Sequence, residues 1–309
     1  MVQENFIKNK IIIICGPTGT GKSRLAALIA DKLGSEVISA DSVAVYKDLN
    51  IGAAKPTEEE KRGVTHHLID VVSPFESFTV SDYERLSLPI IDRLLLEGRT
   101  PVICGGTGYY INAILYKMSY GNAPENKEIR EKYAKLIEEK GCGYVYDILK
   151  EADPETAETT HPNDIMRVVR ALEIYEVSGR KKSDLKDKKI PRYDYTAVSY
   201  DFPREILYNR INSRVDKMFE SGLVEEVKGL IAKGITEENQ CMQGIGYKEV
   251  YEAVKNGTLS EVAEVIKMNS RRYAKRQITF FKKLPELKYI SSGGDAETDA
   301  EKVLQIFNL

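Results

Sequence analysis

The sequence predicts an α/β protein, in which a parallel β-sheet is flanked by helices and interrupted by a helical insertion. Three short apolar runs, at residues 11–15, 36–40 and 101–104, have the composition of strands buried on both faces. Each run ends at a glycine or an aspartate, and helical patterns lie between the runs. Because strands that alternate with helices form parallel sheets, this order indicates an α/β core.

The first helices of the core follow directly after these strands. A helix is expected over residues 23–33, where the apolar side chains share one side. A second is expected over 81–96, because Ser81 followed by Glu84 has the spacing of a capping box. Pro89 lies inside this second helix and predicts a kink there.

From about residue 120 the pattern changes to helical periodicity with many charges and little strand character. The clearest helices are expected over 125–140 and 164–178, and a basic connection follows at 179–192. The remaining elements expected are a strand over 196–200, helices over 204–220, 222–233, 247–255 and 259–283, and a short strand at 288–290. We therefore expect residues 8–119 and 193–309 to form the α/β core and residues 120–192 to form a helical insertion domain.

The composition limits the class of protein. The 309 residues carry a formal net charge of −2, so a nucleic acid partner would have to be bound by a local basic surface. No apolar run reaches the ~18 residues that can span a bilayer, and residues 1–10 lack the apolar segment of a signal peptide. The four cysteines form no Cys-x-x-Cys pair, and the three histidines lack metal-ligand spacing. We expect a cytoplasmic protein with reduced cysteines, and nothing in the sequence demands an oligomer.

The most specific motif is a glycine-rich phosphate-binding loop between the first strand and the first helix. It consists of Gly16, Pro17, Thr18, Gly19, Thr20, Gly21, Lys22 and Ser23. The spacing is G-x-x-x-x-G-K-[ST], in which backbone N–H groups and a lysine bind phosphates and the final hydroxyl can reach Mg²⁺. The motif and its context predict a P-loop NTPase-like sheet and a phosphorylated ligand, with Ser23 as a candidate Mg²⁺ ligand.

NTPases place an acidic residue at the end of a buried strand, and only one of two candidate strands in this sequence has one. One predicted strand ends at Asp41, whereas the other ends in Gly105-Gly106-Thr107 with no carboxylate. An ATP-hydrolysing motor needs a carboxylate at such a place to bind Mg²⁺. The pattern therefore favours phosphate chemistry on a small molecule over a motor.

With these features placed, the chain resembles the tRNA dimethylallyltransferase family (tRNA isopentenyl transferases) from about residue 10 to residue 283. The matching segments are GPTGTGKS at 16–23, ADSVAVYKDLNIGAAKP at 40–56, HHLID at 66–70, GGTGYY at 105–110, HPNDIMRVVRALEIY at 161–175, RINSRVDKM at 210–218, GIGYKE at 244–249 and AKRQITFF at 274–281. Each segment alone is weak evidence for the family, but all of them in this order are highly specific.

The resemblance implies a reaction and roles for three residues. Members of the family transfer a dimethylallyl group from dimethylallyl diphosphate to N6 of adenine 37 in tRNA. In family terms, Asp41 is the base that accepts a proton from N6, and Thr107 donates to the bridging oxygen of the diphosphate. Arg210 and Arg214 share one helix face, and the family pattern favours Arg214 as the diphosphate ligand. Mg²⁺ would help to neutralise the leaving diphosphate.

The resemblance also implies which segments bind the anticodon stem-loop. They map to Asp41, Ser42, Val43, Ala44, Thr107, Arg130, Met166, Arg167, Val168, Val169, Arg170, Gln243, Gly244, Ile245, Gly246, Tyr247 and Lys248. The local charge is consistent with RNA binding, because residues 180–192 include seven Lys or Arg and only two Asp. The last long helix carries further cations and ends in a family signature, Arg276-Gln277, whose role the sequence does not explain.

Several alternatives remain open at this stage. An adenylate isopentenyltransferase would share the loop and the base but act on a free nucleotide; the helical insertion and its basic exit favour tRNA. A P-loop small-molecule kinase would transfer phosphate from ATP, and a non-catalytic RNA-binding module would not need Asp41. His66 and His67 are adjacent and point in different directions, so we expect a structural role for them; Asp70 could hold Mg²⁺ or a neighbouring loop.

Overall fold

The computed structural model describes residues 10–120, 123–185, 190–292 and 294–307, and the chain divides into two units. The larger unit comprises Met1–Leu115 with Pro191–Leu309, and the smaller unit is Tyr116–Ile190. These bounds lie close to the core and the insertion that the sequence suggests. No helix in the described ranges is long and apolar enough to cross a membrane.

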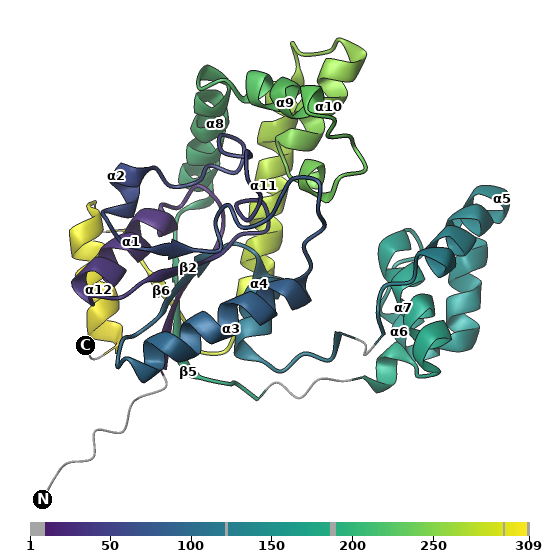
Figure 1. The fold of residues 1–309 in the computed structure, drawn as a ribbon, viewed down its shortest axis with the longest axis horizontal. Helices are drawn as coiled ribbons and strands as arrows, with labels where there is room; N and C mark the ends of the chain where they lie inside the picture. Colours follow the sequence, from purple (N-terminus) through teal and green to yellow (C-terminus); the bar gives the residue numbers. More distant parts are fainter. Residues whose placement is uncertain (1–9, 121–122, 186–189, 293, 308–309) are drawn as a thin grey trace, which may run out of the picture. The chain divides into compact units, whose positions relative to one another are not determined.

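The larger unit is built on a six-stranded sheet with the order β3-β2-β4-β1-β5-β6 (Figure 1). All neighbouring strands are parallel. The strands are β1 (Lys10–Cys15), β2 (Val37–Ala40), β3 (His66–His67), β4 (Val102–Gly105), β5 (Asp194–Tyr200) and β6 (Leu287–Ile290). Ile11 to Ile14 of the central strand β1 are at most 1% exposed, as expected for a strand covered on both faces. The predicted α/β fold is confirmed.

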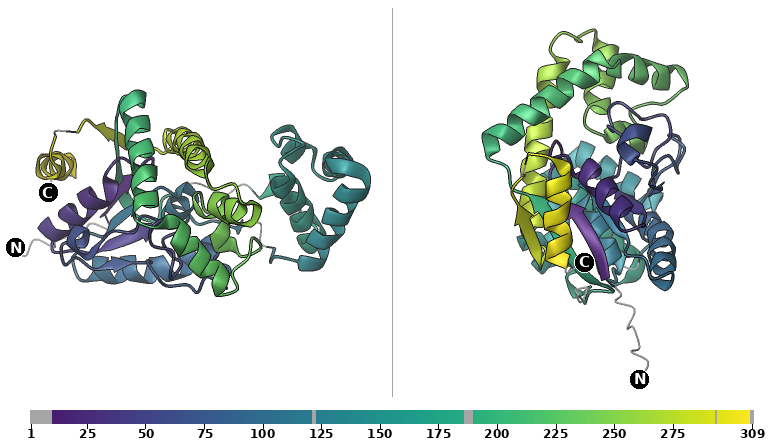
Figure 2. Two further views of the ribbon diagram at one scale, coloured as in Figure 1. Left: turned by 90° about the horizontal axis from the view of Figure 1, so that it is seen from above. Right: turned by 90° about the vertical axis from the view of Figure 1, so that its left-hand side faces the viewer.

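Helices cover both faces of this sheet (Figures 1 and 2). α1 (Lys22–Lys32) and α12 (Ala296–Phe307) pack on one face, where Ile12 and Ile14 of β1 contribute to the core. α3 (Val80–Leu96) and α4 (Gly108–Leu115) cover the other face, and the short α2 (Glu58–Lys61) precedes β3. The sequence analysis did not predict α2, α4, α12 or the two-residue strand β3.

A group of helices from the last third of the chain lies beyond the carboxyl edge of the sheet (Figure 1). It comprises α8 (Arg204–Glu220), α9 (Leu223–Ala232), α10 (Tyr247–Asn256) and α11 (Val262–Phe281), with the 3-10 turn η3 (Gln240–Gln243). These helices agree closely with those expected at 204–283. They supply one wall of the cavity described below.

The start of α3 corrects one prediction. The capping box is formed by Thr79 and Asp82, not by Ser81 and Glu84: the Thr79 hydroxyl accepts from the Asp82 N–H at 3.2 Å, and the Asp82 carboxylate accepts from the Thr79 N–H at 3.1 Å. Aspartate is long enough to close the box at this position, and Glu84 instead pairs with Arg192. The helix continues through Pro89.

The smaller unit is helical, as expected. It consists of α5 (Lys127–Ala152), α6 (Pro154–Glu158), α7 (Ile165–Ser178) and the 3-10 turn η2 (Lys182–Asp184). α5 is longer than the predicted helix over 125–140 because a second helical segment continues beyond Gly141, whose φ of 83° breaks the first. Part of the basic connection, residues 186–189, lies outside the described residues.

A buried glutamate ties α5 to α7 inside this unit. Glu173 is 0% exposed and accepts hydrogen bonds from Nε of Arg130 at 2.9 Å and from the Asn126 N–H at 2.8 Å, and it also pairs with Arg170. Burial alone would raise the pKa of Glu173, but these hydrogen bonds bring it below its ordinary value. A buried carboxylate held in this way is costly to disrupt, because its partners are left uncompensated.

We expect Glu173→Gln to destabilise the insertion by ~3 kcal/mol. Hydrogen exchange across α5 and α7 should accelerate, while exchange in the sheet should not change. Because the pKa of Glu173 is lower in the folded state, its contribution is complete above the ordinary value of 4.5 and is lost as the pH falls through the folded value. The variant should lack this pH dependence. Glu131→Gln, on an exposed side chain of α5, is the control, and equal exchange in both variants would contradict the assignment.

Candidate active site

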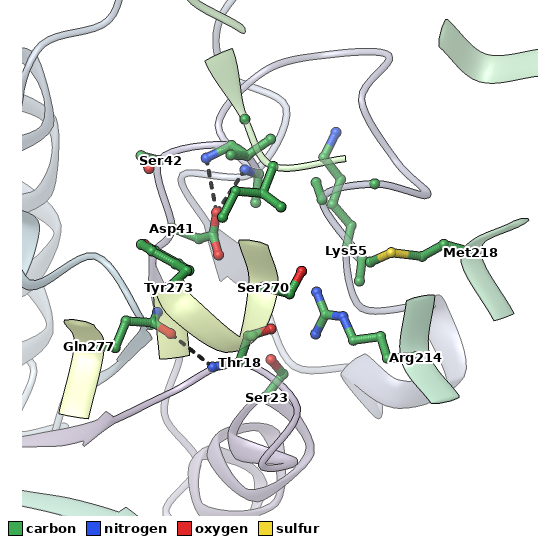
Figure 3. A pocket seen from close by; sticks show the side chains of 18 of the residues that line it. Thr18, Ser23, Asp41, Ser42, Lys55, Arg214, Met218, Ser270, Tyr273 and Gln277 are labelled. Atoms are coloured by element: carbon green, nitrogen blue, oxygen red, sulfur yellow. Dashed lines mark hydrogen bonds between the residues drawn. The ribbon is translucent and has the colours of Figure 1, made fainter. Parts of the chain in front are cut away.

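A cavity of about 330 Å³ lies at the carboxyl edge of the sheet (Figure 3). Its lining comes from the phosphate-binding loop, the loop that follows β2, the end of β4, helices α8 and α11, and residues 243–245. Ligands of open α/β sheets bind at this edge, where the loops from neighbouring strands meet. The position makes this cavity the candidate active site.

The phosphate-binding loop has the geometry of an anion site. Gly19 and Gly21 have φ values of 80° and 88°, which residues with side chains rarely adopt. The N-cap residue of α1 is Gly21, which has no side chain to accept from the N–H groups of the first turn, and such N–H groups can bind anions. Thr18, Lys22 and Ser23 line the cavity, and the Lys22 ammonium donates to the Pro17 carbonyl at 3.4 Å.

Arg214 adds a second cation to the cavity, whereas Arg210 is not among the lining residues. Arg214 points into the cavity from α8 (Figure 3). Arg210, one turn earlier, donates from Nε to the Gly19 carbonyl at 2.8 Å and lies over the ring of Phe202, so it supports the loop from outside. Burial lowers the pKa of both Lys22 and Arg214, and the proximity of Arg214 lowers that of Lys22 further.

Asp41 lies across the cavity from these cations, in the turn after β2. One carboxylate oxygen, Oδ1, accepts from the N–H groups of Val43 at 2.9 Å and Ala44 at 3.2 Å (Figure 3). Among the described residues, none donates a hydrogen bond to the second oxygen, Oδ2. The carboxylate is therefore anchored by one oxygen and can accept a proton on the other.

Thr107 lies next to this turn but does not line the cavity. Its hydroxyl accepts from the Ser42 N–H at 3.0 Å and is 3.3 Å from the Ser42 hydroxyl, to which it donates. In this conformation Thr107 positions Ser42, and a hydrogen bond from Thr107 to a ligand would require its hydroxyl proton to turn away from the Ser42 hydroxyl.

The sequence analysis missed several cavity residues on α11. Ile266, Ser270 and Tyr273 line the cavity together with Gln277. Their spacing places them on one face of the helix, so a search of the long terminal helix for such a stripe would have found them. Burial raises the pKa of Tyr273 to about 12, so this ring stays neutral beside Asp41. Lys55 also lines the cavity and was not singled out.

The predicted RNA-binding segment at 243–248 divides into two parts. Gln243, Gly244 and Ile245 line the cavity, and the Lys248 side chain is exposed. Tyr247, however, is 0% exposed. Its hydroxyl donates to Glu226 at 2.6 Å and accepts from the Ala53 N–H at 3.2 Å. The prediction that the Tyr247 side chain contacts RNA is therefore wrong, because this side chain is buried inside the protein. Gly246, with a φ of 97°, is the N-cap of α10.

The predicted RNA-binding residues of the insertion also differ in how far their side chains are exposed to solvent. Met166 is 77% exposed, and the Arg167 side chain is 61% exposed. Val168 is 2% exposed and packs in the hydrophobic core of the insertion, with Val169 against it. The Val168 side chain is therefore not available to RNA. Arg130 and Arg170 are turned toward Glu173, and part of each side chain remains exposed.

The histidines and Asp70 have structural contacts, as expected for His66 and His67. The His67 ring lies 2.6 Å from the carboxylate of Glu36, and His66 contacts the Val64 carbonyl at 2.9 Å. Asp70 pairs with Lys55 at 2.6 Å, so it holds a neighbouring loop. None of the three lines the cavity.

The chain is similar over nearly its whole length to proteins of known families. A family model described as IPP transferase matches residues 44–284, and one described as isopentenyl transferase matches residues 9–76. A tRNA dimethylallyltransferase of Caldanaerobacter subterraneus subsp. tengcongensis is 46% identical, with 91% of each chain covered. One of Acetivibrio thermocellus is 40% identical, with 96% of each chain covered.

Solved structures agree with these matches. The tRNA isopentenylpyrophosphate transferase of Bacillus halodurans is 37% identical with a TM-score of 0.73, over 97% of this chain and 96% of that one. A eukaryotic dimethylallyltransferase acting on tRNA is 29% identical with a TM-score of 0.83, over 97% of this chain and 78% of that one. By sequence and by fold, the chain belongs to the IPP transferase family.

Proposed function

We propose that this protein transfers a dimethylallyl group from dimethylallyl diphosphate to N6 of adenosine 37 in tRNA. Its relatives are named for this reaction. The observation that carries the proposal is that one cavity joins an anion-binding loop and several cations, Lys22 and Arg214 among them, to the carboxylate of Asp41. A cavity of this size lies at the lower end of the ~300–1,000 Å³ usual for small-ligand sites.

The cationic side of the cavity would bind the donor. Amides of the phosphate-binding loop, Lys22 and Arg214 surround a space suited to the oxygens of a diphosphate. Binding of this anion would relieve the repulsion between the two cations. The same contacts stabilise the charge that develops on the diphosphate as it leaves, which is where catalysis needs them.

The residues present also fit Mg²⁺. This ion keeps several waters and is commonly held by one or two protein oxygens together with substrate phosphates. Ser23 provides a hydroxyl beside the loop, and the described residues include no cluster of three acidic, histidine or cysteine ligands that would form a cage by itself. When bound, the ion would neutralise charge on the diphosphate.

Asp41 would act on the acceptor. The lone pair of the adenine N6 amine attacks C1 of the dimethylallyl group, the C1–O bond breaks, and its electron pair leaves with the diphosphate. The proton lost from N6 passes to Oδ2 of Asp41. Anchoring of Oδ1 by two backbone amides keeps the carboxylate oriented for this transfer.

The acceptor base has to leave its stack to reach this cavity. Enzymes that act on base atoms usually extrude the nucleotide, which costs a few kcal/mol and is easiest in a loop. We propose that residues 42–44 and 243–245 contact the extruded base, and that Met166, Arg167 and the exposed cations of the insertion contact the stem-loop. All of these groups belong to one chain, so we propose that a monomer is sufficient. We also propose, as a separate expectation, that the protein acts in the cytoplasm.

The substrate assignment predicts the outcome of a direct labelling experiment. With labelled dimethylallyl diphosphate and Mg²⁺, an anticodon stem-loop with adenosine at position 37 should be labelled, and AMP should not. A stem-loop with guanosine at that position is the matched control and should stay unlabelled. Labelling of AMP alone, or phosphate transfer from ATP without consumption of the prenyl donor, would exclude the proposal.

The assigned base predicts the effect of replacing Asp41. Asp41→Asn keeps an oxygen that can accept from Val43 and Ala44, so the turn is preserved, but it removes the proton acceptor. Turnover should fall by ~10²–10⁴-fold, the usual contribution of a positioned base, whereas affinity for the stem-loop should change little. Asp48→Asn, an exposed residue of the same loop paired with Lys233, should retain full activity. Normal turnover in Asp41→Asn would refute the role of Asp41.

A further inference from the structure

Gln277 of α11 connects two segments that lie far apart in the sequence. Its carbonyl oxygen Oε1 accepts from the Thr18 N–H at 3.1 Å, within the phosphate-binding loop (Figure 3). Its amide nitrogen Nε2 donates to the Gly106 carbonyl at 3.0 Å, in the turn after β4. The side chain is 5% exposed, so water does not replace these partners easily.

A carboxamide satisfies both partners without a change of protonation. One neighbour is an N–H donor and the other is a carbonyl acceptor, so the side chain has to accept at one end and donate at the other. An ionised glutamate would place an oxygen against the Gly106 carbonyl, and methionine would satisfy neither partner. Space is equally restricted, because a Cβ on Gly106 would lie 2.2 Å from Nε2 of Gln277.

The two segments that Gln277 joins belong to opposite halves of the reaction. Thr18 belongs to the loop assigned to the donor diphosphate. Gly106 precedes Thr107, whose hydroxyl accepts from the N–H of Ser42, the residue after Asp41. The chain of contacts therefore runs from the donor side to the turn that carries the base. Tyr273, one turn before Gln277, lines the cavity from the same helix face.

We propose that Gln277 is a positioning residue that sets the distance between the bound diphosphate and the Asp41 turn. Transfer requires the N6 amine to approach C1 in line with the departing oxygen, and a displacement of about 1 Å can cost ~10²-fold in rate. The inference rests on the proposed function, because it assigns the two ends of the cavity to the donor and the acceptor. Gln277 touches neither reacting atom in this assignment.

The test compares Gln277→Met and Gln277→Glu with the wild-type protein, using the stem-loop assay. Both variants should lose ~10²-fold in kcat at neutral pH, with affinities for inorganic diphosphate and for the stem-loop close to those of the wild type. Thr279→Ala is the matched control, since its exposed hydroxyl only contacts the Lys275 carbonyl on the same helix. An equal loss of stem-loop affinity and turnover, or an unchanged kcat, would overturn the inference.

The pH profile distinguishes positioning from a general loss of stability. A buried carboxyl that faces a carbonyl has a raised pKa, and once protonated it can donate to Gly106. The defect of Gln277→Glu relative to the wild type should therefore shrink as the pH falls, whereas that of Gln277→Met should stay constant. Parallel pH profiles for the two variants would overturn the inference even if Gln277→Met were poorly folded.

A double mutant provides an independent test. Gly106→Ala should displace the Gln277 amide and cause a similar loss of kcat, and combining it with Gln277→Met should cost no more than either change alone. Additive losses would contradict the shared contact. A wild-type protein that fails to label the stem-loop would instead refute the proposed function, so the two failures can be told apart.

Discussion

The candidate active site depends on two buried cations that form no ion pair within the described part of the chain. Lys22 and Arg214 face one cavity, where the negative charge of Asp41 favours the charged form of both, and the Lys22 ammonium donates to the Pro17 carbonyl. Burial lowers the pKa of both groups, which means that the folded state disfavours their charge. An anion bound in the cavity would favour the charged forms of both groups.

The loop that carries Asp41 is held rigidly at its far end, which keeps the carboxylate in place against these cations. Glu226 of α9 accepts from the N–H groups of Asn50 at 2.9 Å and of Gly52 at 3.3 Å, and from the Tyr247 hydroxyl. Lys55 bonds the Tyr46 carbonyl at 2.6 Å and pairs with Asp70. Gly52 has to be glycine, because a Cβ there would lie 2.5 Å from the Tyr247 ring.

The parts of the fold and site that depend on local sequence could be predicted. The phosphate-binding loop, its flanking strand and helix, and the acidic end of β2 follow from short motifs whose geometry is dictated by glycine and by strand burial. Contacts between distant segments could not be predicted. Their i, i+4 spacing alone does not distinguish Arg210 from Arg214, and the structure shows that Arg210 contacts the Gly19 carbonyl whereas Arg214 lines the cavity.

The same limit explains why residues expected at an RNA surface proved to be internal. Tyr247 is aromatic and could stack on a base. Its hydroxyl, however, forms hydrogen bonds with Glu226 and with the Ala53 N–H, which are remote in sequence. Thr79 and Asp82 fit the capping pattern as well as Ser81 and Glu84 do, and the contact of Glu84 with Arg192 decides between the two pairs. Tertiary partners, rather than residue type, determine which polar groups remain free.

Helix α11 lines the cavity and also contacts two of the loop segments beside it. Four residues of the helix line the cavity at helical spacing. They are the apolar Ile266, the hydroxyl residue Ser270, the aromatic Tyr273 and the amide Gln277. None of these four side chains carries a charge at neutral pH, so a search for charged residues does not find them. Yet the helix contacts the phosphate-binding loop and the turn after β4 through one carboxamide. A helix that bridges two loop segments need not contribute chemistry of its own, because its contacts influence how groups on other elements are placed relative to one another.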